Sequence, residues 1–342
     1  MRPQRRCWSS WRAEPRRARR QQPIDNVRPL QTRTRMLFDP SHVRRAFSRS
    51  ASSYDSAAAL QREVGDRLGE SLDYYALDPT RAQSTPSVVL DVGSGTGRMA
   101  AAMQQRWPKA RVVALDLAMP MLCTLPRARG LRRMFDRANA PEPVCADARA
   151  LPIADASVDV LLSNLCLQWV DDLPAVFTGF RRVLKPGGLL LLSTFGPETL
   201  VELREAFASA DESPHVSAFA SIAQVGSALV GSGFRDPVLD RDVFVLPHAD
   251  LASLMRELRT LGATNAMSTR RRTLTGRARF ARAAQAYEPM RRDGALPATW
   301  EVIYAHAWAP PPGTPMRVGG IDEVHVPLSA IPVRRRQPGS GQ

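Results

Sequence analysis

A glycine-rich loop that follows a short apolar segment constrains the fold of this 342-residue chain most. Val88–Val92 has the length and the β-branched content of a buried strand, and the loop Asp91-Val-Gly-Ser-Gly-Thr-Gly97 continues from its end. The amphipathic stretch Gly97–Trp107 predicts a helix that stops before Pro108. A strand, a glycine loop and a helix in this order form the start of a nucleotide-binding βαβ unit.

Short β-branched runs alternate with longer amphipathic stretches along the chain, which predicts parallel βαβ units in an α/β, Rossmann-like fold. The further predicted strands are Arg111–Asp116, Pro143–Ala146, Val158–Ser163, Leu189–Phe195, Val238–Leu246 and Thr299–Trp308. The further predicted helices are 41–77, one from Met119, Asp172–Leu184 closed by a turn at Lys185–Gly188, two within 198–232, Asp250–Leu261 with Asp250 as its cap, and Thr275–Tyr287.

The spacing of the loop glycines narrows the class of ligand. Gly93, Gly95 and Gly97 form G-x-G-x-G, whereas the dinucleotide fingerprint needs its third glycine at the position of Arg98. A pyrophosphate requires a helix N-terminus packed close against the strand. A nucleoside that carries methionine has no phosphate, and needs instead a close backbone approach and an acid for its ammonium group. Asp91 can supply that acid through the loop or a water.

Polar residues at the ends of the next strands favour the same ligand. Asp116 can accept hydrogen bonds from both ribose hydroxyls, although an Asp before a helix is often only a cap. Asp147 can accept from an adenine amino group, and Asn164 lies at the edge where ligands bind to open sheets. Together these features predict S-adenosylmethionine as cofactor. The predicted cofactor-binding residues are Asp91, Gly93, Ser94, Gly95, Gly97, Asp116, Leu117, Met121, Asp147, Ala148, Asn164 and Leu165.

The sequence resembles the class I methyltransferases at Val89–Gly97, Leu115-Asp116, Asp147 and Leu184–Gly188. This resemblance implies S-adenosylmethionine binding and a mostly parallel seven-stranded sheet with an antiparallel strand. Val238–Leu246 and Thr299–Trp308 would then be the last two strands.

A narrower resemblance, to the malonyl-[acyl-carrier protein] O-methyltransferases of biotin synthesis, extends over much of the chain. Its segments are Val43–Arg49, Tyr54-Asp55, Leu60–Glu63, Asn164–Trp169, Pro214-His215, Leu261–Thr264 and Leu274-Thr275. The resemblance implies methylation of the free carboxylate of a malonyl thioester, carried by acyl-carrier protein or coenzyme A.

Two alternatives stay open at this point. One is a hydroxylase that assembles respiratory complex I on the same fold. It is similar at Phe195-Gly196, Thr199-Leu200, Glu202–Arg204, Ser213–His215 and Leu296–Thr299. The other is a methyltransferase that acts on a different small carboxylate.

The chemistry of such a reaction restricts the substrate site. A carboxylate is ionised at neutral pH, so no general base is required. The anionic carboxylate attacks the methyl group of a cationic sulfonium, so the two charges disappear in the reaction. Water would stabilise the separated charges, and a site that excludes water is therefore favoured. This predicts a lid. The candidates are Tyr54, which in the resemblance covers the cofactor, and the insertion after Phe195. The predicted substrate residues are the cationic clamps Arg49, Arg204 and His215, and Gln168 and Trp169, the last of which also suits a core position.

The predicted organisation is one methyltransferase domain, 36–308, between two tails. It comprises a helical cap at 36–80, a cofactor-binding core at 81–195, a lid insertion at 196–236 and a C-terminal part at 237–308, followed by a disordered tail at 309–342. The extension 1–35 is basic and lacks a core pattern, and its composition would also suit a transit peptide. We expect it to be disordered and dispensable.

The net charge of +14 lies mostly in the tails, because residues 36–308 carry only +3. Nucleic-acid binding is therefore not expected. The cluster Arg270–Arg272, Arg277, Arg279 and Arg282 has the sign needed for an acidic carrier protein, or is a solvated face. The four cysteines, Cys7, Cys123, Cys145 and Cys166, lie far apart, which argues against a metal site and a disulfide framework. With no apolar run of membrane length, we expect a cytoplasmic protein; the oligomeric state is left open.

Overall fold

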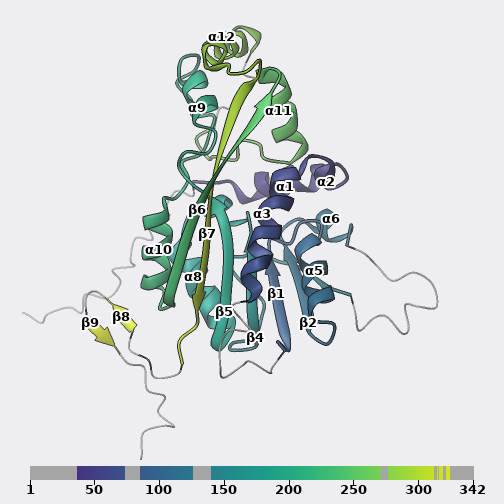
Figure 1. Ribbon diagram of the computed structural model, residues 1–342, viewed down its shortest axis with the longest axis vertical. Helices are drawn as coiled ribbons and strands as arrows, with labels where there is room; N and C mark the ends of the chain where they lie inside the picture. Colours follow the sequence, from purple (N-terminus) through teal and green to yellow (C-terminus); the bar gives the residue numbers. More distant parts are fainter. Residues whose placement is uncertain are drawn as a thin grey trace, which may run out of the picture. The chain divides into compact units, whose positions relative to one another are not determined.

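Seven strands form one mixed sheet in the computed structural model (Figure 1). In chain order they are β1 (Val88–Val92), β2 (Arg111–Asp116), β3 (Glu142–Cys145), β4 (Val158–Asn164), β5 (Leu184–Phe195), β6 (Arg235–His248) and β7 (Leu296–Trp308). Their order across the sheet is β3-β2-β1-β4-β5-β7-β6, and β7 pairs antiparallel with both of its neighbours. The other pairs are parallel, which confirms the predicted sheet.

The structure describes residues 37–73, 85–125, 140–270, 276–311, 314, 316–318 and 321–323. The predicted extension 1–35 and most of the predicted tail 309–342 lie outside these ranges. Within that tail, β8 (Met316–Val318) and β9 (Ile321–Glu323) pair antiparallel, so the prediction of disorder is wrong there. The sequence between them is Gly-Gly, a pair that favours two-residue hairpin turns.

Helices cover both faces of the sheet because its central strands are apolar on both. Leu90 and Val92 of β1 pack with α8 (Leu173–Val183) and α10 (Ile222–Gly231), whereas Val89 packs with α3 (Ala59–Glu70) and α5 (Arg98–Arg106) on the other side. Successive side chains of a strand point to opposite faces, so one short strand serves both cores. Within the described ranges, no helix is long and apolar enough to cross a membrane.

The predicted helix 41–77 is several shorter helices. They are α1 (Pro40–Ser50), α2 (Tyr54–Ala57), α3 and the 3₁₀ turn η1 (Ser71–Asp73). The break follows a run of serines. Ser50 Oγ donates to Phe47 O, and Ser53 Oγ donates to Ser50 O at 3.3 Å. Such side-chain bonds to nearby carbonyls compete with the helical ladder, which apolar periodicity does not reveal.

Beyond the sheet, the long strands β6 and β7 continue into a second core (Figure 1). It is built with α9 (Val201–Ala208), α11 (Leu251–Thr260), α12 (Arg277–Tyr287) and η4 (Glu288–Met290). Its buried residues include Leu203, Leu254, Tyr287 and Trp300. The predicted lid insertion is therefore divided, because α9 joins this core while α10 packs on the sheet.

Two local predictions have different outcomes. Asp250 caps α11 as predicted, with its Oδ1 accepting from Ser253 N at 2.7 Å. The predicted turn at Lys185–Gly188 lies within the bounds of β5 but at an irregularity, because pairing with β4 passes from Leu184 directly to Leu189 and Gly187 has a φ of 68°. Gly187 N donates to Ala309 O and Ala309 N donates to Gly188 O, so the residue that follows β7 holds this irregular segment in place.

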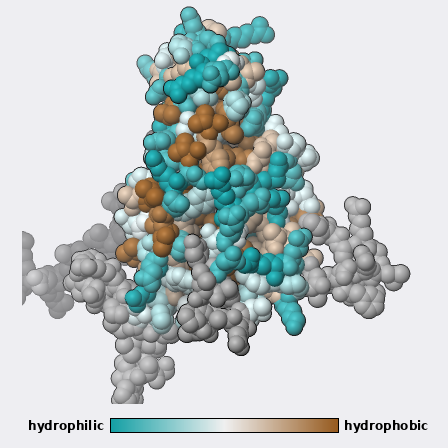
Figure 2. Space-filling view, in the orientation of Figure 1, coloured by the Kyte–Doolittle hydropathy of each residue, from teal (hydrophilic) through white to brown (hydrophobic). Residues whose placement is uncertain are grey.

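The strand β6 forms one edge of the sheet and exposes apolar side chains. Val238, Val243 and Val245 are 53%, 45% and 57% exposed. Figure 2 shows hydrophobic side chains at the surface over this part of the molecule.

Candidate active site

The glycine loop joins β1 to α5 in a conformation that requires glycine. Gly93, Gly95 and Gly97 have φ of 75°, 57° and 84°, which L-residues rarely adopt. A Cβ on Gly93 would lie 2.4 Å from Cys166 Sγ, and one on Gly97 would meet the Leu125 side chain. A Cβ on Gly95 would meet nothing within 4 Å. Gly93 and Gly97 therefore allow close packing, whereas Gly95 faces open space.

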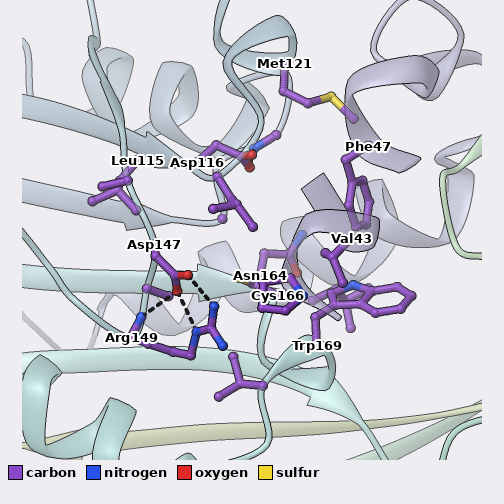
Figure 3. A pocket seen from close by; sticks show the side chains of 18 of the residues that line it. Val43, Phe47, Leu115, Asp116, Met121, Asp147, Arg149, Asn164, Cys166 and Trp169 are labelled. Atoms are coloured by element: carbon purple, nitrogen blue, oxygen red, sulfur yellow. Dashed lines mark hydrogen bonds and ion pairs between the residues drawn. The ribbon is translucent and has the colours of Figure 1, made fainter. Parts of the chain in front are cut away.

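The open space is a pocket at the carboxyl ends of β1, β2 and β4, which we call the cofactor pocket (Figure 3). Its wall includes these predicted residues: Tyr54, Gly93, Gly95, Asp116, Leu117, Met121, Asp147, Ala148, Asn164 and Leu165. A smaller recess beside it shares Tyr54, Gly93, Gly95 and Asn164 and adds Asp91 and Ser94. Of the predicted cofactor residues, only Gly97 lines neither space.

Asp116 is fixed by backbone donors before any ligand binds. Its Oδ2 accepts from Gly95 N at 2.9 Å, and its Oδ1 accepts from Ala118 N at 2.7 Å. Burial raises the pKa of Asp116, while the backbone donors oppose that shift. The carboxylate can accept further hydrogen bonds from ribose hydroxyls, because two oxygens offer about four lone-pair sites.

Asp91 offers the recess an unsatisfied acceptor. Its side chain is buried, and Oδ2 has no hydrogen-bond partner among the described residues. Burial raises the pKa of Asp91 to about 7. An ammonium group placed here would provide the missing donor and the compensating charge, so this residue fits the methionine end of the expected cofactor.

Asp147 lies in the cofactor pocket with a partner that the sequence analysis did not identify. Arg149 Nε donates to Asp147 Oδ1 at 2.9 Å (Figure 3), and this hydrogen bond lowers the pKa of Asp147. The carboxylate can still accept from an adenine amino group, because an ionised carboxylate takes several donors.

Helix α1 forms part of the wall of the cofactor pocket, which the sequence analysis missed. Val43 and Phe47 lie on one face of α1 and line the pocket (Figure 3). Their spacing of four residues on an amphipathic helix was the available signal. Phe47 also packs edge-on against Trp169, with ring centroids 5.6 Å apart.

A second cavity, the aromatic pocket, adjoins the first at Trp169, which lines both. Its wall contains Phe195, Phe207, Phe219 and Trp300, and the Phe195 and Trp300 rings lie 5.0 Å apart. Trp169 Nε1 and Trp300 Nε1 are buried donors without a hydrogen-bond partner in the described part of the chain. The same holds for the acceptor Gln168 Oε1. The pocket thus combines apolar walls with a few unsatisfied polar atoms, as ligand sites do.

The predicted substrate residues are divided among three places. Gln168, Trp169 and His215 line the aromatic pocket. The His215 ring stacks on Phe207 with centroids 4.0 Å apart, and its Nε2 lies 3.2 Å from Asp211 Oδ2.

The other two predicted clamps, Arg204 and Arg49, line neither pocket. Arg204 Nη2 donates to the carbonyls of Pro197 and Thr199 at 2.9 and 3.1 Å. These local acceptors hold the guanidinium at the start of α9, outside the walls of both pockets. Arg49 lies on the other side of α1, in a separate cavity.

Comparisons with known proteins agree with this site. The family model described as "Methyltransferase domain" matches residues 90–192, from β1 to β5, which supports the predicted cofactor, S-adenosylmethionine. The malonyl-[acyl-carrier protein] O-methyltransferase of Xylella fastidiosa (strain M23) is 56% identical over 88% of this chain and 98% of its own length. Proteins of the same name from Gallionella capsiferriformans (strain ES-2) and Laribacter hongkongensis (strain HLHK9) are 44% and 47% identical over 81% and 80% of this chain, and over 93% and 90% of their own lengths. The chain therefore belongs to the malonyl-[acyl-carrier protein] O-methyltransferases, enzymes that use S-adenosylmethionine.

Proposed function

We propose that this protein methylates the free carboxylate of a malonyl thioester, an early step of biotin synthesis. The observation that carries the proposal is the junction at Trp169. There the cofactor pocket meets a cavity whose wall, in the described part of the chain, offers unsatisfied N–H donors and no carboxylate. An anionic acceptor would satisfy these donors, and it needs no general base.

Residues already described would hold the cofactor. Asp91 would bind its ammonium group, Asp116 its ribose hydroxyls and Asp147 its adenine amino group. Tyr54 lines both the cofactor pocket and its recess, so its ring would cover the ligand between these ends. When bound, S-adenosylmethionine supplies an electrophilic methyl on a sulfonium, which an ionised carboxylate attacks to give an ester and a neutral thioether.

The residues of the site would position the reacting groups and exclude water, and none of them needs to transfer a proton. Trp169 and Trp300 would donate to the acceptor carboxylate, whose ordinary pKa near 4 leaves it ionised. Phe38 and Phe47 pack edge-on against Trp169, with centroids 6.1 and 5.6 Å away, and so fix the indole. Apolar walls exclude water, which would otherwise stabilise the separated charges more than the transition state in which they meet.

Among the described residues, the ionisable groups in the wall of the aromatic pocket are His215 and Arg259. The His215 ring is held in this wall by stacking on Phe207 and by its contact with Asp211. His215, Arg259 and the two tryptophan N–H groups would then bind the malonyl carboxylate, a role for which the sequence suggested Arg204.

The carrier of the malonyl group is inferred from the relatives. Their name specifies malonyl-acyl-carrier protein, and we propose this cytoplasmic carrier as the partner, with malonyl-coenzyme A as a second donor of the same group. The relatives reported above give no support for the hydroxylase alternative.

Mass spectrometry of the carrier protein tests the proposal. Purified protein, S-adenosylmethionine and malonyl carrier protein should produce a carrier in which one methyl replaces one proton. Acetyl carrier protein, which lacks the free carboxylate, is the matched control and should stay unchanged. Absence of methylation while the protein still binds the cofactor would contradict the proposal. Restored growth without biotin, in a strain lacking this methyltransferase, would provide independent support.

A further inference from the structure

A cationic pocket lies beside the aromatic pocket. Its ionisable lining residues are His42, Arg45 and Arg49 of α1 and Arg259 of α11. Arg259 and Thr264 line both the cationic and the aromatic pocket, so the two cavities are neighbours along one wall. The three arginine side chains lie at the surface, where a ligand from solvent can reach them.

The charge of this pocket is not neutralised from within. Its lining contains no Asp or Glu, and in the described ranges no ion pair involves Arg45, Arg49 or Arg259. Nearby Arg270 differs, because its Nη2 lies 3.4 Å from Asp39 Oδ2 and 3.3 Å from His42 Nδ1. Burial, reinforced by the surrounding arginines, lowers the pKa of His42. The positive charge is therefore that of the three arginines.

Close packing of two elements holds the pocket in shape. Gly262, just after α11, approaches α1 so closely that a Cβ would lie 2.7 Å from Ser50 Oγ. Ser53 Oγ lies 3.5 Å from Thr260 O, and Thr264 Oγ1 lies 3.4 Å from His42 Nε2. The arginines of α1 and α11 are thus presented from a fixed junction.

We propose that the cationic pocket binds the phosphate of the 4′-phosphopantetheine arm that delivers the malonyl group. The inference rests on the proposed function. Both malonyl carrier protein and malonyl-coenzyme A place a phosphate at the end of pantetheine remote from the thioester. Arginine is well suited to phosphate because its planar fork donates two parallel hydrogen bonds. The arm would then extend from the cationic pocket along Arg259 and Thr264, with the malonyl end in the aromatic pocket.

This assignment differs from the basic cluster singled out in the sequence. Arg270 is engaged with Asp39 and His42, and Arg282 Nη2 donates to Ala210 O at 2.9 Å. Arg271 and Arg272 lie outside the described residues. None of the cluster's described members lines the aromatic or the cationic pocket.

Three substrates separate the phosphate from the rest of the arm: malonyl carrier protein, malonyl-coenzyme A and phosphate-free malonyl-pantetheine. In the double variant Arg45→Ala/Arg49→Ala, we expect kcat/KM to fall at least about tenfold for both phosphate-bearing substrates, since a lost charge-assisted bond costs about 1.5 kcal/mol or more. The already low value for malonyl-pantetheine should not change. Arg235→Ala, which removes an exposed cation at the start of β6, is the matched control and should leave all three substrates unaffected.

Each other outcome overturns the assignment. Equal losses on malonyl-pantetheine would show that the arginines act on the acyl end or on the fold. A loss confined to the carrier protein would indicate a protein–protein contact instead of phosphate binding, and no loss at all would exclude a role.

Binding measurements separate this inference from the proposed function. Free coenzyme A should bind the wild-type protein more tightly than pantetheine does by calorimetry, and the double variant should abolish the difference. This comparison does not require methyl transfer. If coenzyme A binds as expected but no malonyl thioester is methylated, the proposed function fails and the phosphate site stands. If methylation occurs but both ligands bind equally, the phosphate site fails.

Discussion

Asp116 Oδ2 accepts the backbone N–H of Gly95 at 2.9 Å, so a side chain at the end of β2 is hydrogen-bonded directly to the glycine loop. This bond holds the carboxylate and the loop in their relative positions before the cofactor binds. Preorganisation of this kind lowers the entropic cost of binding. The same carboxylate is therefore both a structural acceptor and a ligand-binding group.

Replacing Asp116 by Ala should weaken S-adenosylmethionine binding by about 3 kcal/mol, because two hydroxyls lose a charged acceptor. Calorimetry measures the change in Kd. Asp172→Ala is the control, since Asp172 caps α8 and accepts from Ala175 N away from the cofactor pocket. It should cost about 1 kcal/mol of stability and no affinity. An unaltered Kd in the Asp116 variant would refute the ribose assignment.

Cofactor affinity should depend on pH through Asp91. Its pKa of about 7 means that the free protein is increasingly protonated below neutrality, and a neutral carboxyl no longer attracts an ammonium. The Kd should thus rise about tenfold per pH unit below about 7. Above about 8 the affinity should fall again as the cofactor's amino group loses its proton. Titrations from acid to alkaline pH should give a maximum between these values.

The control for this pH dependence is Asp91→Asn. This variant should bind S-adenosylmethionine weakly, and its Kd should no longer rise as the pH falls below neutrality. If the Kd of this variant still rises at acidic pH, the titration belongs to another group.

Gly95→Leu should block the cofactor while preserving the fold. The new side chain would point into open space, so its structural cost is the positive φ, about 1–2 kcal/mol. Gly294→Leu has a similar φ of 80° and open space far from the pocket, and so carries the same strain. Thermal denaturation should show similar losses in both variants, but only the first should abolish S-adenosylmethionine binding. Normal binding by Gly95→Leu would mean that the cofactor lies elsewhere.

Trp169→Phe should impair the acceptor more than the cofactor. The substitution keeps an aromatic ring beside Phe47 and removes the unsatisfied Nε1 donor. We expect kcat/KM for malonyl carrier protein to drop about tenfold or more, with the Kd for S-adenosylmethionine nearly unchanged. Trp308 lies at the end of β7, away from Trp300 of the aromatic pocket. Trp308→Phe should therefore change neither kcat/KM nor the Kd for S-adenosylmethionine. Equal kinetics for the two variants would remove Trp169 from the clamp.

Glu301→Ala should destabilise the fold by about 2–3 kcal/mol. Glu301 is 2% exposed, accepts from Glu198 N at 2.8 Å and pairs with Arg241 at 3.1 Å, which fixes the segment after β5. Glu288→Ala, which breaks the exposed pair with Arg291, should cost much less stability, because solvent screens such a pair. Urea denaturation of both variants checks this order, and similar midpoints would contradict it.

The sequence predicted the sheet well because its signals are local. The strands β1 and β2 have the predicted bounds, since each is a short, largely apolar run with a carboxylate within its last two residues. The cofactor residues followed from the same pattern, because parallel strands bring their carboxyl ends to one edge. Where local signals compete, prediction failed, as at the serines between α1 and α2, which divide the predicted cap helix.

The substrate side was less predictable because it depends on contacts between distant segments. Trp300 lies in β7, yet its indole lines a pocket with Trp169, more than a hundred residues earlier. Arg204 has the charge expected of a clamp, but carbonyls a few residues away hold it elsewhere. No spacing rule reveals either relationship.

Helix α1 presents Val43 and Phe47 to the cofactor pocket and Arg45 and Arg49 to the cationic pocket. One rigid rod therefore belongs to two binding sites. Any free energy that one ligand spends on fixing the position of α1 is not needed again when the other ligand binds. By thermodynamic reciprocity, whatever factor one ligand adds to the affinity of the other through this helix, the second adds to the first. Such coupling would favour the ternary complex over the two binary complexes, and it would act only across the width of one helix.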